Sequence, residues 1–306
     1  MTANKTKYIT LSNETSYSKY PNSRVEPSPN WLIAKRELGW LWVAHVYGFA
    51  AIFALIATFS VTFIVCKRGA IFKKRKAHFA VMLSALAVAG FLRSVVLLWN
   101  PYVSSNNSLD SQVLFCVISW GIATACITSS FSIMLLILVE TTKTSLGPER
   151  LKNLPFLITM TLVNVLYLLL SELVVWFHPE AQVMIFICHV AFACWGLVVS
   201  IGYSVAGARM WRNLKASLDG AFFSRTLYQE SNSLKRLFIL MFFASSFGAI
   251  NFTVSLYTAI GEFGVYSEKR YIKTWDWFIV QSTQRTLESL QCIFIFLIVF
   301  KAPNDD

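Results

Sequence analysis

The residues best suited to chemistry lie near the C-terminal end of the chain, in residues 275–300, a stretch that is largely apolar. Five charged or amide side chains interrupt it between Phe278 and Phe300: Gln281, Gln284, Arg285, Glu288 and Gln291. At about 100° per residue they fall within an arc of roughly 120° on one side of a helix. A charged stripe on a membrane helix cannot face lipid. It must therefore be covered by other helices or line a wet cavity.

Four further ionisable side chains interrupt other apolar runs: His45, Arg93, Glu172 and His189. An ionised side chain at the centre of a membrane helix costs roughly 2.5–3.5 kcal/mol on insertion scales. These groups are therefore expected to face the interior of a helical bundle, at mid-depth or towards its outer side. No His, Cys, Asp or Glu set has the spacing of a metal site.

Two interpretations of these groups remain open. In the structural one, Arg285 pairs with Glu288 three residues later, Arg93 pairs with Glu172 or Glu288, and the glutamines bridge helices. In the functional one, the same groups line a cavity open to the outside. Arg93 and Arg285 would then bind an anionic or polar ligand, with His45 and His189 as secondary contacts. A transporter or channel path is a third alternative, although no internal repeat with paired broken helices is visible.

The composition points to a membrane protein. Of the 306 residues, 56% are hydrophobic and only 14% are charged, against about 25% charged in soluble domains. The net charge of +11 comes from basic residues beside apolar runs, which is typical of cytoplasmic loops. We therefore expect a lipid bilayer, and no nucleic acid, as the partner.

The positions of the apolar runs predict an all-α fold, a bundle of seven transmembrane helices. The runs cover about Gly39–Cys66, Ala77–Trp99, Gln112–Val139, Pro155–Phe177, Ala181–Ala208, Leu237–Ile260 and Trp275–Phe300. The predicted organisation is a flexible extracellular or lumenal tail (1–38), a membrane domain (39–301) and a short cytoplasmic tail (302–306).

The distribution of basic residues predicts the orientation. Lys and Arg gather in the connections 67–76, 143–152 and 209–236, whereas those after the second and fourth runs contain none. This bias places the N-terminus outside and the C-terminus in the cytoplasm, although Lys269, Arg270 and Lys273 break the trend. Three Asn-x-Ser/Thr sequons then lie outside as predicted glycosylation sites: Asn4, Asn13 and Asn106.

The connection 209–236 is the longest on the predicted cytoplasmic side. Its first residues, from Arg209 to Lys215, resemble a helix end lying at an anionic lipid surface. The alternative is a docking site for a cytosolic partner.

Known enzyme and receptor motifs do not fit the chain. It contains no HxxxH or HExxH pair and no Gly-x-Ser-x-Gly elbow, so we expect no enzyme activity and no cofactor. Its seven-helix pattern invites comparison with rhodopsin-like receptors. However, the third run ends Glu140-Thr141-Thr142 rather than Asp-Arg-Tyr, and the last run has no Asn-Pro-x-x-Tyr.

Three short motifs carry a different resemblance. They are Trp42-Val43-Ala44-His45-Val46-Tyr47-Gly48, then the segment from Arg93 to Tyr102, then Trp277, Gln281, Arg285 and Glu288 in the last run. In this order they resemble the membrane domain of the proline-rich transmembrane protein 3 and 4 family. The chain departs from that family in its short, proline-poor tail and in the turn Asn100-Pro101-Tyr102-Val103, which lacks a Gly.

The resemblance implies an integral membrane protein and supplies no ligand or reaction. The sequence alone therefore leads to a receptor-like or scaffolding protein with a buried polar network between its second and seventh helices. The alternatives are a receptor for a small extracellular ligand and a transporter or channel. The plasma membrane or another membrane of the secretory pathway is the expected location.

Overall fold

The computed structural model describes residues 28–66, 74–99, 102, 110–141, 154–220, 225–264, 266–267 and 271–301. Within these residues the fold is all-α. The α-helices are α1 (Trp31–Leu38), α2 (Trp40–Cys66), α3 (Lys74–Trp99), α4 (Asp110–Thr141), α5 (Leu154–Phe177), α6 (Val183–Gly220), α7 (Arg225–Ile260) and α8 (Thr274–Lys301). A short 3₁₀ helix, η2 (Pro179–Ala181), joins α5 to α6.

Six of the described helices, α2 to α7, are long and apolar enough to cross a membrane. The protein is therefore a polytopic α-helical membrane protein. The seventh predicted span, α8, is 28 residues long, which is about 42 Å at 1.5 Å per residue. It is not among the six, and polar and charged residues interrupt its apolar sequence.

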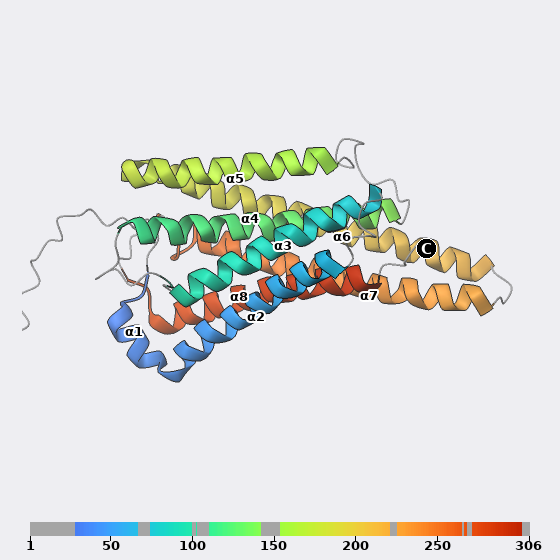
Figure 1. Cartoon of the computed structure of the whole chain (residues 1–306), viewed down its shortest axis with the longest axis horizontal. Helices are drawn as coiled ribbons and strands as arrows, with labels where there is room; N and C mark the ends of the chain where they lie inside the picture. Colours follow the sequence, from blue (N-terminus) through green and yellow to red (C-terminus); the bar gives the residue numbers. More distant parts are fainter. Residues whose placement is uncertain are drawn as a thin grey trace, which may run out of the picture.

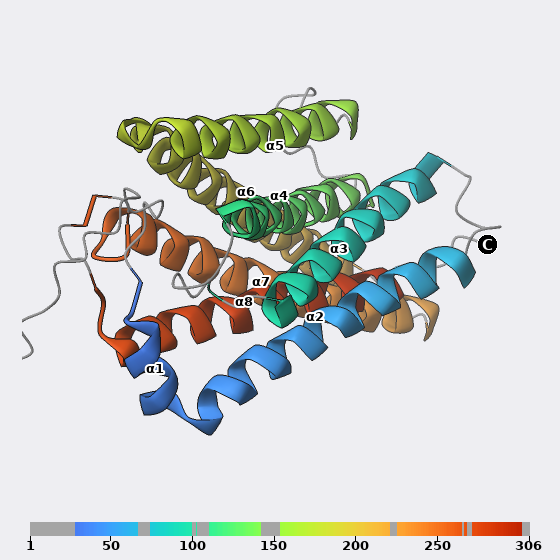
Figure 2. The same ribbon diagram turned by 60° about the vertical axis from the view of Figure 1, so that its left-hand side comes forward.

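The long helices run roughly along one axis and form an elongated bundle (Figures 1 and 2). The chain neighbours α2 and α3, α3 and α4, and α6 and α7 pack against one another, whereas α5 lies at the edge against α4 and α6. Helix α8 contacts α1, α2, α4 and α7. This central position gives the polar side of α8 other helices to face.

Apolar side chains on the outer faces of the helices, such as Phe59 on α2 and Leu166 on α5, are exposed. In a bilayer they would contact lipid. Inside, α2 and α3 approach closely at Gly90, where an added Cβ would lie 2.6 Å from the Phe53 carbonyl oxygen and 2.9 Å from the Ala57 nitrogen. Glycine is therefore the residue that lets these two backbones pack.

Residues 31–38, predicted to belong to a flexible tail, form helix α1. Trp31, Ala34 and Leu38 recur at helical spacing and are all buried. Trp31 and Ala34 pack with Ile272, which precedes α8, and with Trp277 in the first turn of α8. Gly39 has φ +51°, a left-handed conformation that ends α1 and turns the chain into α2.

The predicted connection at 209–236 lies between two candidate spans, Val183–Arg209 and Phe238–Ile260, but the expectation that it is a loop is wrong. Helix α6 continues to Gly220 and α7 begins at Arg225, so most of this segment is helical. The two helices extend side by side beyond the rest of the bundle (Figure 1). The sequence from Arg209 to Leu218 has no Gly or Pro and is rich in good helix formers, so an apolar run that ends at the membrane surface does not end the helix.

Candidate functional site

A buried ionic network joins α3, α4 and α8. Arg93 Nη2 on α3 donates hydrogen bonds to Glu288 Oε1 at 2.8 Å and to Thr124 Oγ1 on α4 at 2.8 Å. Arg285 Nη1 donates to the other carboxylate oxygen of Glu288. Arg285 Nη2 donates to Gln281 Oε1 at 3.1 Å. We call these five residues, Arg93, Thr124, Gln281, Arg285 and Glu288, the polar network.

The polar network has one positive charge in excess, because two guanidinium groups share a single carboxylate. Arg93 and Arg285 are each 1% exposed and Glu288 is 3% exposed. Trp120 on α4 supplies further contact, since both guanidinium carbons lie 3.8 Å from its ring centre. Such cation–π contacts strengthen when the cation has lost its water. They therefore stabilise both arginines.

A second polar contact ties α2 to α8. His45 Nδ1 lies 2.9 Å from Ser282 Oγ, and His45 Nε2 lies 2.7 Å from the Tyr102 hydroxyl. The Tyr102 ring packs edge-on to Trp277, with ring centres 4.5 Å apart, and stacks with Trp31. Burial raises the pKa of the Tyr102 phenol above its ordinary value, against the opposing effect of the nearby Arg285 charge.

Tyr102 has a backbone φ of 58°, which is unusual for a non-glycine residue. This is the turn that lacks the glycine seen in the resembling family. Its hydrogen bond to His45 and its aromatic contacts hold the ring in place. The side-chain contacts thus offset the backbone strain.

Amide side chains connect α7 to α8. Gln284 Nε2 donates to Ser255 Oγ at 3.3 Å, and Asn251 Nδ2 donates to Gln291 Oε1 at 3.0 Å. Asn251 Oδ1 and Gln291 Nε2 are buried without a hydrogen-bond partner. A buried polar atom without a partner is costly. Asn251 Oδ1 could accept one further hydrogen bond, and Gln291 Nε2 could donate one.

A cavity of about 340 Å³ opens beside the polar network and is called the main cavity here. Helices α4 to α8 supply most of its wall, and Ser28, Trp31 and Tyr102 also line it. Its polar lining includes Thr124, Glu172, His189, Asn251, Ser255, Gln281, Gln284, Arg285 and Glu288. Its apolar lining includes Leu114, Val117, Trp120, Val175, Trp176, Ile185, Phe192, Phe252, Phe263 and Trp277.

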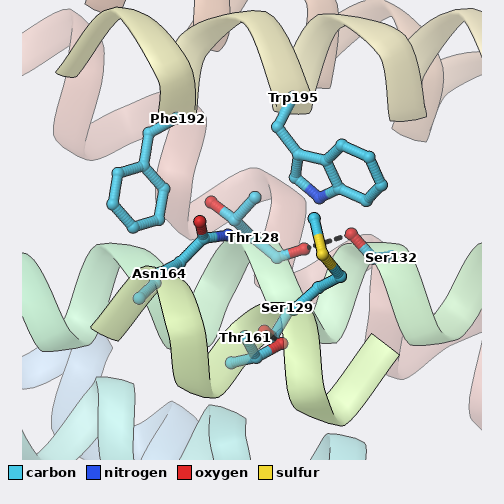
Figure 3. Close-up of a pocket in the computed structure, with 9 residues that line it drawn as sticks. Thr128, Ser129, Ser132, Thr161, Asn164, Phe192 and Trp195 are labelled. Atoms are coloured by element: carbon cyan, nitrogen blue, oxygen red, sulfur yellow. Dashed lines mark hydrogen bonds between the residues drawn. The ribbon is translucent and has the colours of Figure 1, made fainter. Parts of the chain in front are cut away.

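A much smaller cavity lies between α4, α5 and α6 (Figure 3). Its volume is about 10 Å³, which is close to the least that holds one water molecule. Thr128 and Phe192 line both cavities. The hydroxyls of Ser129 on α4 and Thr161 on α5 are hydrogen-bonded at 2.5 Å. The site has the size and polarity for a bridging water, not for an organic ligand.

The structure brings most of the predicted site residues together. Arg93, Gln281, Arg285 and Glu288 share one network, and the partner of Arg93 is Glu288. Gln284, Glu172 and His189 line the main cavity, whereas His45 contacts its lining residue Tyr102. Arg93 lies one layer behind the wall, against Trp120, Thr124 and Glu288. The predicted glycosylation sites Asn4, Asn13 and Asn106 lie outside the described residues.

Sequence reasoning missed the site roles of Trp120, Tyr102 and Thr124. One sequence feature could have located the cavity face of α4. Val117, Gly121, Thr124 and Thr128 recur every three or four residues and all line the main cavity. Among the described residues, no group of three or more His, Cys, Asp and Glu side chains could hold a metal ion.

Fold and site together define a class: a polytopic α-helical membrane protein with a buried ionic network beside an internal cavity. The chain belongs to the family of the proline-rich transmembrane protein 3 domain, whose model matches residues 16–304. The predicted family resemblance is thus confirmed. No curated protein and no solved structure matches the chain.

The motifs that carried the resemblance converge in space. His45 from the first motif contacts Tyr102 from the second. Arg93, also from the second, pairs with Glu288 from the third. Trp277 packs against Tyr102. Three segments that are distant in the sequence therefore build one site.

Proposed function

We propose that the protein is a seven-helix, receptor-like membrane protein that binds a small ligand in the main cavity. The observation that carries this proposal is a cavity of about 340 Å³ whose wall includes the buried pair Arg285 and Glu288. Ligand sites typically measure about 300–1,000 Å³ and combine an apolar lining with a few polar groups. The main cavity meets both criteria.

The proposal counts α8 as the seventh span. Its apolar residues Ile279, Ile293 and Leu297 are exposed on the outside of the bundle, whereas Arg285 and Glu288 are buried inside it. Exposed apolar and buried charged side chains are the reverse of the pattern in a water-soluble protein. They suit a helix that has lipid on one side and polar partners on the other. With seven spans and the basic connections in the cytoplasm, the N-terminus lies outside and the C-terminus inside.

The polar network offers a way for the ligand to affect the bundle. Glu288 bridges Arg93 on α3 to Arg285 on its own helix, α8. A ligand that contacts Arg285 competes with Glu288 for that guanidinium and so alters the link between α3 and α8. A ligand shifts a conformational equilibrium only by such differential contacts. A cytosolic partner would contact the ends of α6 and α7 that extend beyond the rest of the bundle, at about residues 209–236.

The same network also serves the structural role, since it fastens α3, α4 and α8 together. A transporter or channel is less well supported. Further along the helices, past Glu288 on α8, apolar side chains such as Phe131, Met134 and Ile295 pack into one buried cluster. A cluster of this kind does not provide a water-filled path.

Thiol labelling tests whether the main cavity is reachable from outside. Cys116 is buried and lines the cavity, whereas Cys292 is buried in the apolar cluster. Two variants that each keep one of these cysteines form a matched pair. A membrane-impermeant thiol reagent applied to intact cells should label the Cys116 variant and leave the Cys292 variant unlabelled. Equal labelling of the two, or none of either, would contradict an outward-opening cavity.

A further inference from the structure

We infer that the main cavity binds a small amphipathic carboxylate, with the anionic head at Arg285 and the apolar body among aromatic side chains. This inference rests on the proposed function, since it assigns a ligand class to the same cavity. Neither the charge of the ligand nor its shape follows from the cavity volume. The charge follows from the polar network at one side of the cavity, and the shape follows from the side chains that line the rest of it.

The charge of the network indicates an anion. Arg93 and Arg285 share the carboxylate of Glu288, which leaves one positive charge without a counter-charge inside the network. Arg285 Nε is buried and has no hydrogen-bond partner, and the same is true of Arg93 Nε and Nη1. Buried charges are normally paired because isolated ones are costly. A ligand carboxylate would supply the missing negative charge.

The position of Arg285 makes it the contact for the head group. Arg285 lines the main cavity, whereas Arg93 lies behind it. Gln281 and Gln284 line the same region, and their side-chain amides carry N–H donors that can orient a carboxylate. Arginine binds carboxylates through paired, planar N–H donors. The geometry therefore favours a carboxylate head over a spherical anion.

The other carboxylate of the wall, Glu172, lies on a different side of the cavity. It is carried by α5, which packs against α4 and α6, whereas Arg285 is on α8, which packs against α1, α2, α4 and α7. A carboxylate head bound at Arg285 is thus held by α8 and not by the helix that carries Glu172. Glu172 is for this reason the side chain that distinguishes an anionic ligand from a cationic one.

The rest of the cavity suits an apolar body. Trp176, Phe192 and Phe263 line it together with aliphatic side chains from α4, α5 and α6. A single inorganic anion would leave most of about 340 Å³ unfilled. A ligand with an aromatic ring or short alkyl chain attached to the carboxylate fills both parts.

Three isosteric probes test the head group: 3-phenylpropionate, 3-phenylpropanol and 3-phenylpropylamine. Binding to the purified protein in nanodiscs is measured by tryptophan fluorescence and by the thermal unfolding midpoint. The acid should bind saturably, and at least about tenfold more tightly than the alcohol or the amine, because it alone brings a negative charge to Arg285 and can accept two hydrogen bonds from its guanidinium. Decanoate is added as a lipid-derived carboxylate. Tighter binding of decanoate than of phenylpropionate would identify a membrane source, and the reverse order an aqueous one.

Two variants assign the binding to the proposed contacts. Arg285→Gln should reduce affinity for the acid at least about tenfold, and Arg285→Lys should restore part of it. Glu172→Gln should keep or tighten binding of the acid. Because Arg285 belongs to the polar network, Ala259→Phe serves as a second test, since it fills the cavity without altering a charge. It should abolish binding of the acid.

The outcomes separate the two proposals. If the amine or the alcohol binds as tightly as the acid, and Ala259→Phe abolishes that binding, the cavity is a ligand site but the carboxylate assignment is wrong. Loss of amine binding in Glu172→Gln would point the same way. If none of the four probes binds, both the ligand class and the proposed function are overturned.

Discussion

At the scale of single residues, Glu288 is the centre of the site. The sequence predicts a pair between Arg285 and Glu288 within the last helix and leaves Glu172 or Glu288 as the partner of Arg93, and in the structure Arg93 binds the same carboxylate as Arg285. This addition changes the expected effect of mutations. Removal of Arg285 leaves Arg93 and Glu288 paired, whereas removal of Glu288 leaves two buried cations without a counter-charge.

Glu288→Ala should therefore be the most damaging single change in the polar network. Removal of one partner of a buried ion pair costs about 3–5 kcal/mol, and here both cations lose their partner. Arg285→Met should cost less, because a neutral pair remains. The measurement is the thermal unfolding midpoint and the monodisperse yield in detergent, with Gln284→Ala as control. If Arg285→Met proves the more damaging, the shared-carboxylate arrangement is not the one that stabilises the bundle.

The hydrogen bond between Tyr102 and His45 tests how far side chains fix the turn after α3. Tyr102→Phe removes the hydroxyl that lies 2.7 Å from His45 Nε2 but keeps the aromatic packing. The expected loss is about 1 kcal/mol, read as a lower unfolding midpoint. Tyr257→Phe is the matched control, because Tyr257 is exposed and should tolerate the change. Equal effects of the two substitutions would show that the His45 contact adds no stability.

The sequence singles out a residue where its side chain is costly in a membrane, and it overlooks a residue where the side chain is not. Arg93, Arg285 and Glu288 stand out in apolar runs because charge in lipid is unfavourable. Trp120 and Tyr102 do not stand out, since aromatic residues are common both in cores and at membrane interfaces. Their roles depend on which helices pack together, and one sequence does not contain that information.

At the scale of elements, apolar runs located the long helices because each must cover the bilayer core. The expectation of a loop failed at 209–236, where α6 and α7 continue past their apolar runs. Hydropathy indicates where a helix leaves the lipid. The helix itself can continue in water until residues unfavourable to helix end it, as Gly220 does for α6. Hydropathy also missed α1. This helix is too short for a membrane span, but one of its faces is buried.

The packing of α2 on α3 should depend on Gly90. Gly90→Ala places a Cβ within 3 Å of two backbone atoms of α2, and the helices must separate to accept it. Overpacking of this kind costs about 1–3 kcal/mol. Gly48→Ala on α2 is the control, because a Cβ added at Gly48 meets no neighbouring atom within 4 Å. Unfolding midpoints should fall for Gly90→Ala and remain or rise for Gly48→Ala. The opposite order would mean that the close contact is relieved without cost.

At the scale of the whole molecule, α8 determines the parity of the membrane domain. Six described helices satisfy length and hydropathy, and an even number of spans would place both termini on one side. In the proposed topology α8 is the seventh span, because its polar side faces the main cavity and the bundle interior while Ile279 and Ile293 are exposed. Hydropathy averaged along the chain does not distinguish the polar face of α8 from its apolar face, because the average includes both faces.

Parity can be tested with one cell line. A C-terminal epitope tag on the chain should bind antibody only after permeabilisation, while the sequons at Asn4, Asn13 and Asn106 acquire glycans that a glycosidase removes. The tag reports the side reached after α8, and the glycans report the side of the N-terminal tail and of the connection after α3. Replacement of all three asparagines by Gln should abolish the glycosidase shift and leave the tag result unchanged. A tag that is accessible in intact, glycosylated cells would mean that α8 does not cross the membrane. Helix α8 would then carry its part of the polar network into the bundle from one membrane surface without reaching the other surface.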